Sequence, residues 1–377
     1  MAKIPHLFFT AILLLANIGL QADSIDPPDI DASGYLLVDF QSGDALVEKN
    51  AHQRIEPASI TKIMTAYVIY QELEQGNISL DDDVLISQKA WEMKGSRMFV
   101  KLGKKVKLHD MLLGLIVQSG NDAAVAIAEH VAGSEEAFVA RMNLVAKELN
   151  LENTHYENVT GWPSPNHYTT ASDIAYLSKR LIIEYPEHYK MYSQKEYTYN
   201  KINQRNRNQL LWKDKSVDGI KTGHTESAGY CLAASAKRHD MRLISVVLGT
   251  NSSEERTAYT RQLLEFGFRF YETHLLYKAG SVLTEARVWK GDKNQVPLGT
   301  IEDLYVTIQK NQYQNLKGIM EIDTGIDAPI KRGDVLGKIA LTHKGKVVRE
   351  APLIAMQNVS EGGYWDRVID SVKKFFD

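Results

Sequence analysis

The order of strand-like and helix-like segments is the feature of this sequence that most limits its fold. Two apolar runs around a Gly-containing turn predict a β-hairpin at 35–49, ahead of a long helical block. Two more strand patterns follow only after that block, at 228–236 and 241–249, with a helical pattern at 254–270. Strands separated in sequence by a block of helices are typical of an α+β domain with an antiparallel sheet.

The helical block begins with a segment, 57–75, in which apolar residues occupy nearly every side of the expected helix. A helix of this kind is buried in the interior rather than lying on the surface. Two further helices are predicted at 107–132 and 134–150, because apolar residues recur there at steps of three and four. The later helix at 254–270 is expected to pack back on the sheet.

After about Glu272 the pattern changes to short strand-like runs separated by Gly and Asp turns. These runs lie at 281–289, 304–309, 317–322, 337–342 and 346–353. Regular spacing of this kind predicts a small all-β module of roughly 80 residues. We therefore expect a first domain at 23–272 and a β-rich domain at 273–355.

The first 22 residues have the pattern of a secretory signal peptide. Lys3 supplies a positive charge, and an apolar run then extends from Leu7 to Leu20. This run is short for a hydrocarbon core of ~30 Å, and it fits a signal that is cleaved after Ala22. The alternative is an uncleaved signal anchor. An exported chain with a single cysteine, Cys231, suits a bacterial periplasm.

The last segment, 356–377, is predicted to contain an amphipathic helix. Its apolar stripe consists of Trp365, Val368, Ile369, Val372, Phe375 and Phe376. The opposite face carries Asp366, Arg367, Asp370, Lys373 and Lys374. One interpretation is a terminal helix docked on its own domain. The other, which we expect, is an anchor that lies in the plane of the inner membrane.

Charge and composition exclude several classes of function. The chain has 44 Lys and Arg against 47 Asp and Glu, and its formal charge of −3 argues against a nucleic-acid binder, which needs a basic face. A single cysteine excludes an intrachain disulfide, a cysteine-based zinc site and a CxxC redox motif. The 11 histidines include no HExxH pair, and no G-x-S-x-G sequence is present. We therefore do not expect a metal hydrolase.

A candidate nucleophile and base lie at the start of the helix predicted at 57–75. Nucleophilic catalysis needs an activated nucleophile, a neighbouring base and donors for the developing oxyanion. Ser59 and Lys62 are three residues apart, so the amine can reach the hydroxyl within one helical turn. A lysine among apolar residues has its charged form disfavoured, which suits a general base. The same spacing recurs at Ser371 and Lys374, where we interpret it as accidental.

A second short motif, Ser119-Gly120-Asn121, follows the apolar run at 112–117. It offers a hydroxyl for proton transfer and an amide that can hold a substrate amide. The pattern is weak by itself, because another Ser-x-Asn occurs in an evident loop at 164–166.

The third motif is Lys221-Thr222-Gly223, followed by His224, and it leads to the strand that begins near Gly229. On an edge strand, Lys221 and Thr222 would face a substrate carboxylate. Gly223 would let the substrate backbone approach closely, because glycine has no side chain.

The three motifs in this order resemble the signature of penicillin-binding proteins and serine β-lactamases. Nearly the whole chain resembles the low-molecular-mass penicillin-binding proteins, specifically the D-alanyl-D-alanine carboxypeptidases. The resemblance extends over segments 57–62, 118–123, 167–171, 206–208, 210–212 and 218–225. It implies a penicillin-binding and β-lactamase-like α+β domain, with an antiparallel sheet and a helical block, followed by a small all-β domain and a terminal amphipathic helix. At 160–162 the chain has Thr-Gly-Trp where Asn-Gly-Leu is expected, which puts its fine substrate preference in doubt.

The resemblance also implies a role for each motif. Ser59 would be the acylated nucleophile and Lys62 its base, with Ser119 and Asn121 beside them. The substrate-binding residues would be Lys221, Thr222, Gly223, His224, Arg207 and Arg256. The oxyanion hole would use the backbone N–H groups of Ser59 and His224.

For three of these residues another interpretation stays open. Arg207 and Arg256 would lie near the terminal carboxylate of the substrate, or else form surface salt bridges. His224 could be a structural residue whose side chain does no chemistry.

The implied activity is removal of the terminal D-Ala from the pentapeptide stems of peptidoglycan through an acyl-enzyme. β-Lactams would acylate the same Ser59, and this mechanism would need no metal and no organic cofactor. A D,D-endopeptidase is an alternative within the superfamily, and a non-catalytic cell-wall-binding module is another. A serine β-lactamase is a third, but the only Leu-Asn pair that could belong to its E-x-x-L-N motif, 149–150, has Ala146 in place of the glutamate.

Overall fold

The computed structural model describes residues 25–365 and 367–370. The first body of the protein contains a five-stranded antiparallel sheet, in the order β2-β1-β9-β8-β7. The strands are β1 (Gly34–Asp39), β2 (Ala45–Lys49), β7 (Val217–Thr225), β8 (Gly229–Arg238) and β9 (Met241–Thr250). The hairpin predicted at 35–49 therefore pairs with strands that follow the helical block, as the element order indicated. Strand β7 lies at the edge of the sheet, where it pairs only with β8 among the described strands.

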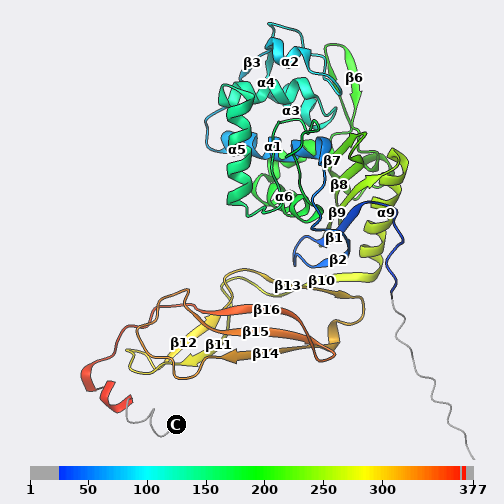
Figure 1. Cartoon of the computed structure of the whole chain (residues 1–377). Coiled ribbons are helices and arrows are strands. Elements are labelled where there is room, and N and C mark those ends of the chain that lie inside the picture. Colours follow the sequence, from blue (N-terminus) through cyan, green and yellow to red (C-terminus); the bar gives the residue numbers. More distant parts are fainter. Residues whose placement is uncertain (1–24, 366, 371–377) are drawn as a thin grey trace, which may run out of the picture.

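Helices cover both faces of this sheet (Figure 1). Helix α9 (Ser253–Phe270) packs on one face, where Leu263 and Leu264 join an apolar cluster with Leu243 and Val247 of β9. The other face belongs to a larger cluster with the helical block, and it receives the alternate β9 residues Ile244, Val246 and Leu248. This alternation is the period-two pattern expected for a sheet buried on both sides.

The helical block comprises α1 (Lys62–Glu74), α3 (Leu108–Ile116), α4 (Asn121–Ala132), α5 (Glu135–Glu148) and α6 (Ala171–Glu184). The segment predicted as one helix at 107–132 is two helices, so that prediction was wrong. The helix is interrupted at 117–120, where Ser119 has a φ of 64° and Gly120 precedes the first turn of α4. Apolar residues continue at helical spacing through the break, which is why periodicity did not reveal it.

The helix predicted at 57–75 also begins differently from what we expected. The short 3₁₀ turn η1 (Ala58–Thr61) precedes α1, and the two elements are buried except at Ser59 and in the last four residues of α1. Smaller elements that the sequence did not predict surround the block. They are α2 (Gln88–Glu92), α7 (Pro186–Tyr189), η2 (Lys190–Ser193), α8 (Leu210–Lys213), β3 (Asp83–Leu85), β4 (Lys105–Lys107), β5 (Glu196–Tyr199) and β6 (Ile202–Arg205).

The second body is an all-β domain that continues directly from α9. A five-stranded antiparallel sheet, ordered β11-β12-β16-β15-β14, encloses a separate apolar core, and β10 pairs with β13 beside it. Its elements are β10 (Tyr271–Tyr277), β11 (Val282–Arg287), β12 (Gln295–Gly299), β13 (Leu304–Gln309), η3 (Tyr313–Asn315), β14 (Leu316–Ile322), β15 (Val335–His343) and β16 (Lys346–Ala355). Each predicted run contains a strand, whereas β10 and β12 were not predicted.

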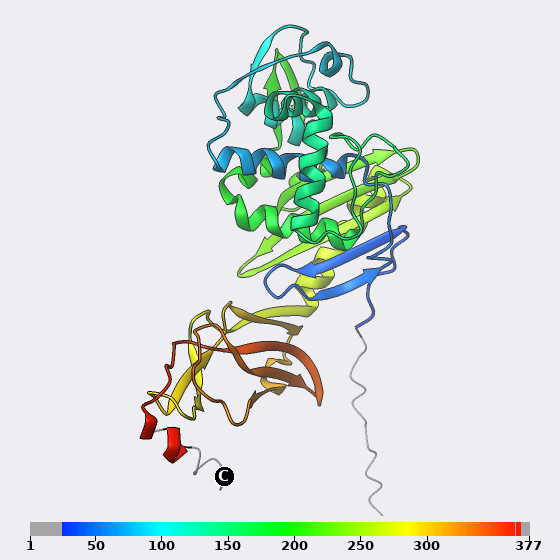
Figure 2. The ribbon, with the colours of Figure 1, turned by 60° about the vertical axis from the view of Figure 1, so that its left-hand side comes forward.

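The β-domain lies beside the β1–β2 turn, at the end of the first sheet that is remote from β7 (Figure 2). Polar contacts join the two bodies there. The buried Asp39 carboxylate accepts a hydrogen bond of 2.7 Å from Thr273, and the Ser42 hydroxyl lies 2.7 Å from that of Thr307.

The predicted signal peptide at 1–22 lies outside the described residues, and so does part of the predicted terminal helix. The described part of that helix is helical at 364–365 and 367–370. There Trp365 is 73% exposed and Ile369 49% exposed. Within the described chain, no helix has the length and apolar character needed to cross a membrane.

Candidate active site

The η1 turn brings the predicted nucleophile and base into contact. Three residues make one turn of a 3₁₀ helix, so side chains at i and i+3 lie on the same side. Accordingly, the Lys62 Nζ atom lies 3.0 Å from the Ser59 Oγ atom, within hydrogen-bond range. Lys62 is 1% exposed, whereas Ser59 remains partly accessible. The contact inferred from the i, i+3 spacing is therefore present.

The environment of Lys62 favours a neutral amine. Its Nζ atom donates to the side-chain oxygen of Asn121 and to the backbone carbonyl of Thr160, each at 2.8 Å. Burial lowers the pKa of Lys62 to about 7, and the positive charge of Arg207 acts in the same direction, against the smaller effect of Asp122. A lysine that can lose its proton near neutral pH is suited to act as a general base.

The break between α3 and α4 places Ser119 and Asn121 beside this pair. The Asn121 amide nitrogen donates to the Lys94 carbonyl at 2.7 Å, which orients its oxygen toward Lys62. The Ser119 Oγ atom is buried and has no hydrogen-bond partner within the described chain. Since buried hydroxyls normally have a partner, this oxygen is suited to contact a substrate or relay a proton.

The edge strand β7 carries the third motif. Lys221 is 2% exposed and its Nζ atom donates to the Thr222 carbonyl at 3.0 Å. Burial holds the pKa of Lys221 well below its ordinary value, assisted by the positive charges of Lys62, Arg207 and Arg256. Two lysines and two arginines therefore influence one another across the site.

Two glycines allow close packing around η1. A Cβ atom on Gly223 would lie 2.9 Å from the Pro57 carbonyl oxygen, so β7 approaches the nucleophile turn itself. The space at Gly223 is thus used by η1, rather than by the substrate backbone that we expected. On the other side, a Cβ atom on Gly161 would lie 1.7 Å from the Ala58 carbonyl oxygen, and its φ is 83°. Only glycine fits at this position.

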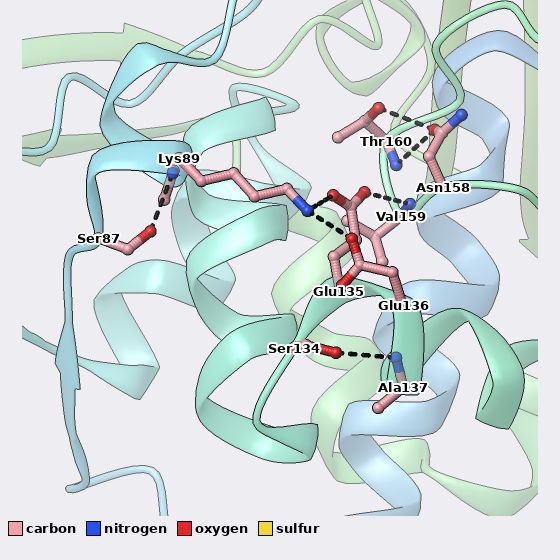
Figure 3. Close-up of polar contacts among 10 residues, drawn as sticks. Ser87, Lys89, Ser134, Glu135, Glu136, Ala137, Asn158, Val159 and Thr160 are labelled. Carbon is pink, nitrogen blue, oxygen red and sulfur yellow. Dashed lines mark hydrogen bonds and ion pairs between the residues drawn. The ribbon is translucent and has the colours of Figure 1, made fainter.

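The loop that carries Gly161 is held by a polar network that the sequence did not predict (Figure 3). The Asn158 side-chain oxygen accepts hydrogen bonds from the backbone N–H groups of Thr160, Gly161 and Trp162. Glu135 accepts from the Val159 N–H at 3.2 Å and pairs with Lys89 at 2.9 Å. The network fixes the Thr160 carbonyl that contacts Lys62. An Asn shortly before a glycine is typical of a turn, and this signal could have identified Asn158.

Arg207 and Arg256 lie on the other side of the site. Arg207 donates from Nε to the Gln118 carbonyl at 3.1 Å, and Arg256 donates from Nη1 to the Gly223 carbonyl at 3.0 Å. Within the described chain neither arginine forms a salt bridge, so that alternative is wrong. His224 is exposed and its ring lies over that of Tyr230, with 3.9 Å between the centroids.

The other positions that the sequence analysis considered lie outside the site. Cys231 is fully buried in β8, and burial raises the pKa of its thiol to about 11. Ala146, at the position where a β-lactamase glutamate was sought, is buried in α5. Among the described residues, no group of three or more His, Cys, Asp or Glu side chains could hold a metal ion.

Comparison with known proteins identifies the family of this chain. The family model for D-alanyl-D-alanine carboxypeptidase matches residues 21–252, and that for the C-terminal domain of penicillin-binding protein 5 matches 271–361. The D-alanyl-D-alanine carboxypeptidase DacC of Escherichia coli is 45% identical, covering 94% of this chain and 90% of that protein.

Solved structures give the same result. The crystal structure of penicillin-binding protein 5 from Haemophilus influenzae is 42% identical with a TM-score of 0.88, covering 90% of this chain and all of the other. A Listeria monocytogenes penicillin-binding protein in its ampicillin-bound form is 27% identical with a TM-score of 0.60, over 64% of this chain and 99% of the other. This chain belongs to the D-alanyl-D-alanine carboxypeptidase family of penicillin-binding proteins, and its activity is that of a serine-type D-Ala-D-Ala carboxypeptidase.

Proposed function

We propose that Ser59 is the nucleophile and Lys62 the general base with which this chain removes terminal D-Ala from the pentapeptide stems of peptidoglycan. The observation that carries the assignment is the 3.0 Å contact between the two side chains, combined with a pKa of about 7 for the Lys62 amine. In this mechanism neutral Lys62 takes the proton of Ser59 as its Oγ atom attacks the carbonyl carbon of the penultimate D-Ala.

The developing oxyanion is bound by the backbone N–H groups of Ser59 and His224. The C–N bond then breaks, and terminal D-Ala leaves as an amine. We assign the proton transfer to its nitrogen to Lys62 and Ser119, because the buried Ser119 hydroxyl is otherwise unpartnered in the described chain. Asn121 holds Lys62 in place and contacts the substrate amide. A water molecule finally hydrolyses the ester on Ser59.

The free carboxylate of the substrate is recognised by cations. Lys221 and Thr222 face it from β7, with Arg207 and Arg256 beside them. Within the described chain, no carboxylate lies at salt-bridge distance from Lys221, Arg207 or Arg256. A substrate carboxylate would supply the missing negative charge. The same features accommodate a β-lactam carboxylate, and we expect β-lactams to acylate Ser59, as the ampicillin-bound relative suggests.

We further propose that the chain acts in the periplasm as two domains, 23–272 and 273–355, held at the inner membrane by 356–377. The signal pattern at 1–22 supports export. The exposed apolar side chains of Trp365, Val368 and Ile369 support membrane attachment. Deleting 362–377 is expected to release the protein into the soluble fraction, and a truncated protein that still sediments with membranes would refute the anchor.

The catalytic assignment is tested by mass analysis after incubation of the mature protein with a monomeric pentapeptide muropeptide. The wild-type enzyme is expected to release a single alanine, and Ser59→Ala to release none. Ser360→Ala changes an exposed serine that follows the β-domain, far from Ser59 in the chain; it is the matched control and should behave as wild type. Unchanged turnover by Ser59→Ala would disprove the nucleophile, and no cleavage by the wild-type protein would favour a wall-binding module.

A further inference from the structure

His167 is a buried histidine beside the active site that the proposed mechanism does not use. Its exposed fraction is 2%, and its ring packs edge-on against that of Tyr156, with 5.6 Å between the centroids. Two residues further on, the backbone N–H and carbonyl of Thr169 pair with those of Ile55 at 2.9 Å each, just before η1. The His167 ring is therefore held in place beside the turn that carries Ser59.

The surroundings of His167 define which of its ring nitrogens carries the proton. The Glu157 backbone N–H donates to Nδ1 at 3.2 Å, so Nδ1 is unprotonated. Burial lowers the pKa of His167 to about 4, and His155 and Lys62 act in the same direction, against the effect of Glu157. The ring is therefore neutral near pH 7, and its single proton lies on Nε2.

Two hydrogen bonds lead from this proton to the backbone of η1. The Nε2–H of His167 donates to the Thr61 Oγ1 atom at 2.8 Å. The Thr61 hydroxyl in turn donates to the Ala58 carbonyl oxygen at 2.9 Å. All three residues are buried, where hydrogen bonds are stronger than in water and polarise one another. The orientation of the Ala58 carbonyl thus depends on His167.

The Ala58 carbonyl belongs to the same peptide unit as the Ser59 N–H, which is one of the two proposed oxyanion donors. The bond between Ala58 and Ser59 is trans. Because a trans peptide unit is planar, its C=O and N–H point in opposite directions. The direction in which the Ala58 carbonyl is held therefore sets the direction of the Ser59 N–H. A hydrogen bond accepted by the carbonyl also polarises the unit and makes its N–H a stronger donor.

The backbone of Ala58 needs such support. Its φ is 46°, a left-handed conformation that a residue with a Cβ atom rarely adopts. A conformation of this kind persists only where surrounding contacts hold it. On one side the Gly161 backbone packs closely against the Ala58 carbonyl. This packing excludes some positions of the carbonyl oxygen, whereas the hydrogen bond from Thr61 selects one of the remaining directions.

We propose that His167 is a positioning residue that, through Thr61, orients the Ser59 N–H toward the oxyanion that develops on the substrate carbonyl. The inference rests on the proposed function, because it concerns the backbone N–H of the assigned nucleophile. His167 itself takes no proton in the reaction. Since the negative charge on the carbonyl oxygen is present only as acylation proceeds, loss of His167 lowers the acylation rate and has little effect on substrate binding.

The test uses the full mature chain and two peptide esters ending in D-Ala–D-lactate, identical except that sulfur replaces the scissile carbonyl oxygen in one. Sulfur is a weak hydrogen-bond acceptor, so acylation by the sulfur ester depends little on the oxyanion donors. His167→Leu is expected to lower the maximal single-turnover release of D-lactate from the oxygen ester about tenfold, with the half-saturating concentration within about twofold. The rate with the sulfur ester should stay within about twofold, so the ratio of the two rates falls about tenfold.

Three further variants separate orientation from packing. Thr61→Val removes the hydroxyl but nearly keeps the shape, and should reproduce the effect. The double variant His167→Leu/Thr61→Val should lose no more than either single variant, because both residues act through one carbonyl. His167→Gln keeps an N–H donor for Thr61 and should acylate within about threefold of the wild-type rate.

His188→Leu is the matched control. His188 is a partly buried histidine whose ring stacks on that of Tyr70 in α1, with 4.8 Å between the centroids, and its loss should leave the ratio unchanged. The inference is overturned if His167→Leu and Thr61→Val slow both esters equally, as a structural defect would, or if they leave both rates unchanged. A wild-type enzyme that reacts equally fast with both esters would overturn it as well. If Ser59→Ala still releases D-lactate, or the wild-type enzyme releases none from either ester, the proposed function itself fails.

Discussion

Lowering the pH from 8 to 6 is expected to slow acylation of Ser59 about tenfold, because only neutral Lys62 can accept the serine proton. With a pKa of about 7, about nine tenths of the amine is neutral at pH 8 and about one tenth at pH 6. The rate should therefore rise through pH 7 and level off above pH 8. An ordinary lysine, with a pKa near 10.5, would give a rate that still rises about tenfold per unit above pH 8.

The pH at which the acylation rate rises depends on the surroundings of Lys62. Burial is the main cause of the low pKa, and the charge of Arg207 is the second. Arg207→Gln removes a repelling positive charge, so it makes protonation of Lys62 easier. The midpoint of the pH profile should then move to higher pH, and acylation at pH 7 should fall even after substrate binding is saturated.

The assay is the rate of covalent adduct formation with benzylpenicillin, followed by intact-protein mass spectrometry between pH 5.5 and 9. Saturating β-lactam separates acylation from binding, and Ser59→Ala sets the background. Histidines ordinarily titrate in the same range, so His224→Gln is the control and should keep the midpoint. A rate independent of pH between 6 and 8, or a midpoint that disappears in His224→Gln, would refute the role of Lys62 as the base.

Three other perturbations test the packing around the site. Asn158→Ala leaves the backbone N–H groups of Thr160 and Gly161 without their acceptor, while the Trp162 N–H keeps the Thr160 hydroxyl. We therefore expect kcat to fall at least about tenfold and unfolding stability to drop by about 1–3 kcal/mol, measured by turnover and urea titration. Gly161→Ala places a Cβ atom against the Ala58 carbonyl oxygen and should cost more than about 3 kcal/mol in the same titration, whereas Gly76→Ala, with a similar φ but open space, should cost about 1 kcal/mol. Cys231, buried with a raised thiol pKa, should resist iodoacetamide until the protein is unfolded, as peptide mass mapping would show.

The sequence predicted the elements in which apolar residues recur with a clear period. The pattern at 241–249 gave β9 because alternate residues enter two different apolar clusters. The same reasoning failed at 107–132, because the apolar spacing of α3 continues into α4. The turn between them depends on the left-handed conformation of Ser119, which no periodicity reports.

For the site, sequence reasoning identified the groups that chemistry requires but not those that hold them. Ser59 and Lys62 were predictable, because their contact depends on three residues of local geometry. Glu135 was not predictable, because it lies at the start of α5 and its side chain accepts a hydrogen bond from the Val159 N–H in a separate loop. Arg207 and Arg256 were identified only through the family resemblance, because they lie far apart in the chain and only the fold brings both to the site.

The electrostatics of the site explain why this enzyme would act at a free C-terminus. Lys62 and Lys221 are buried, and within the described chain neither has a carboxylate at salt-bridge distance. The nearby Asp122 carboxylate instead accepts hydrogen bonds from three backbone N–H groups of the adjoining loop. Arg207 and Arg256, which have no carboxylate at salt-bridge distance in the described chain either, therefore give the site a positive charge that the protein leaves uncompensated. A peptide that ends in a carboxylate supplies the missing charge, whereas an internal peptide bond does not.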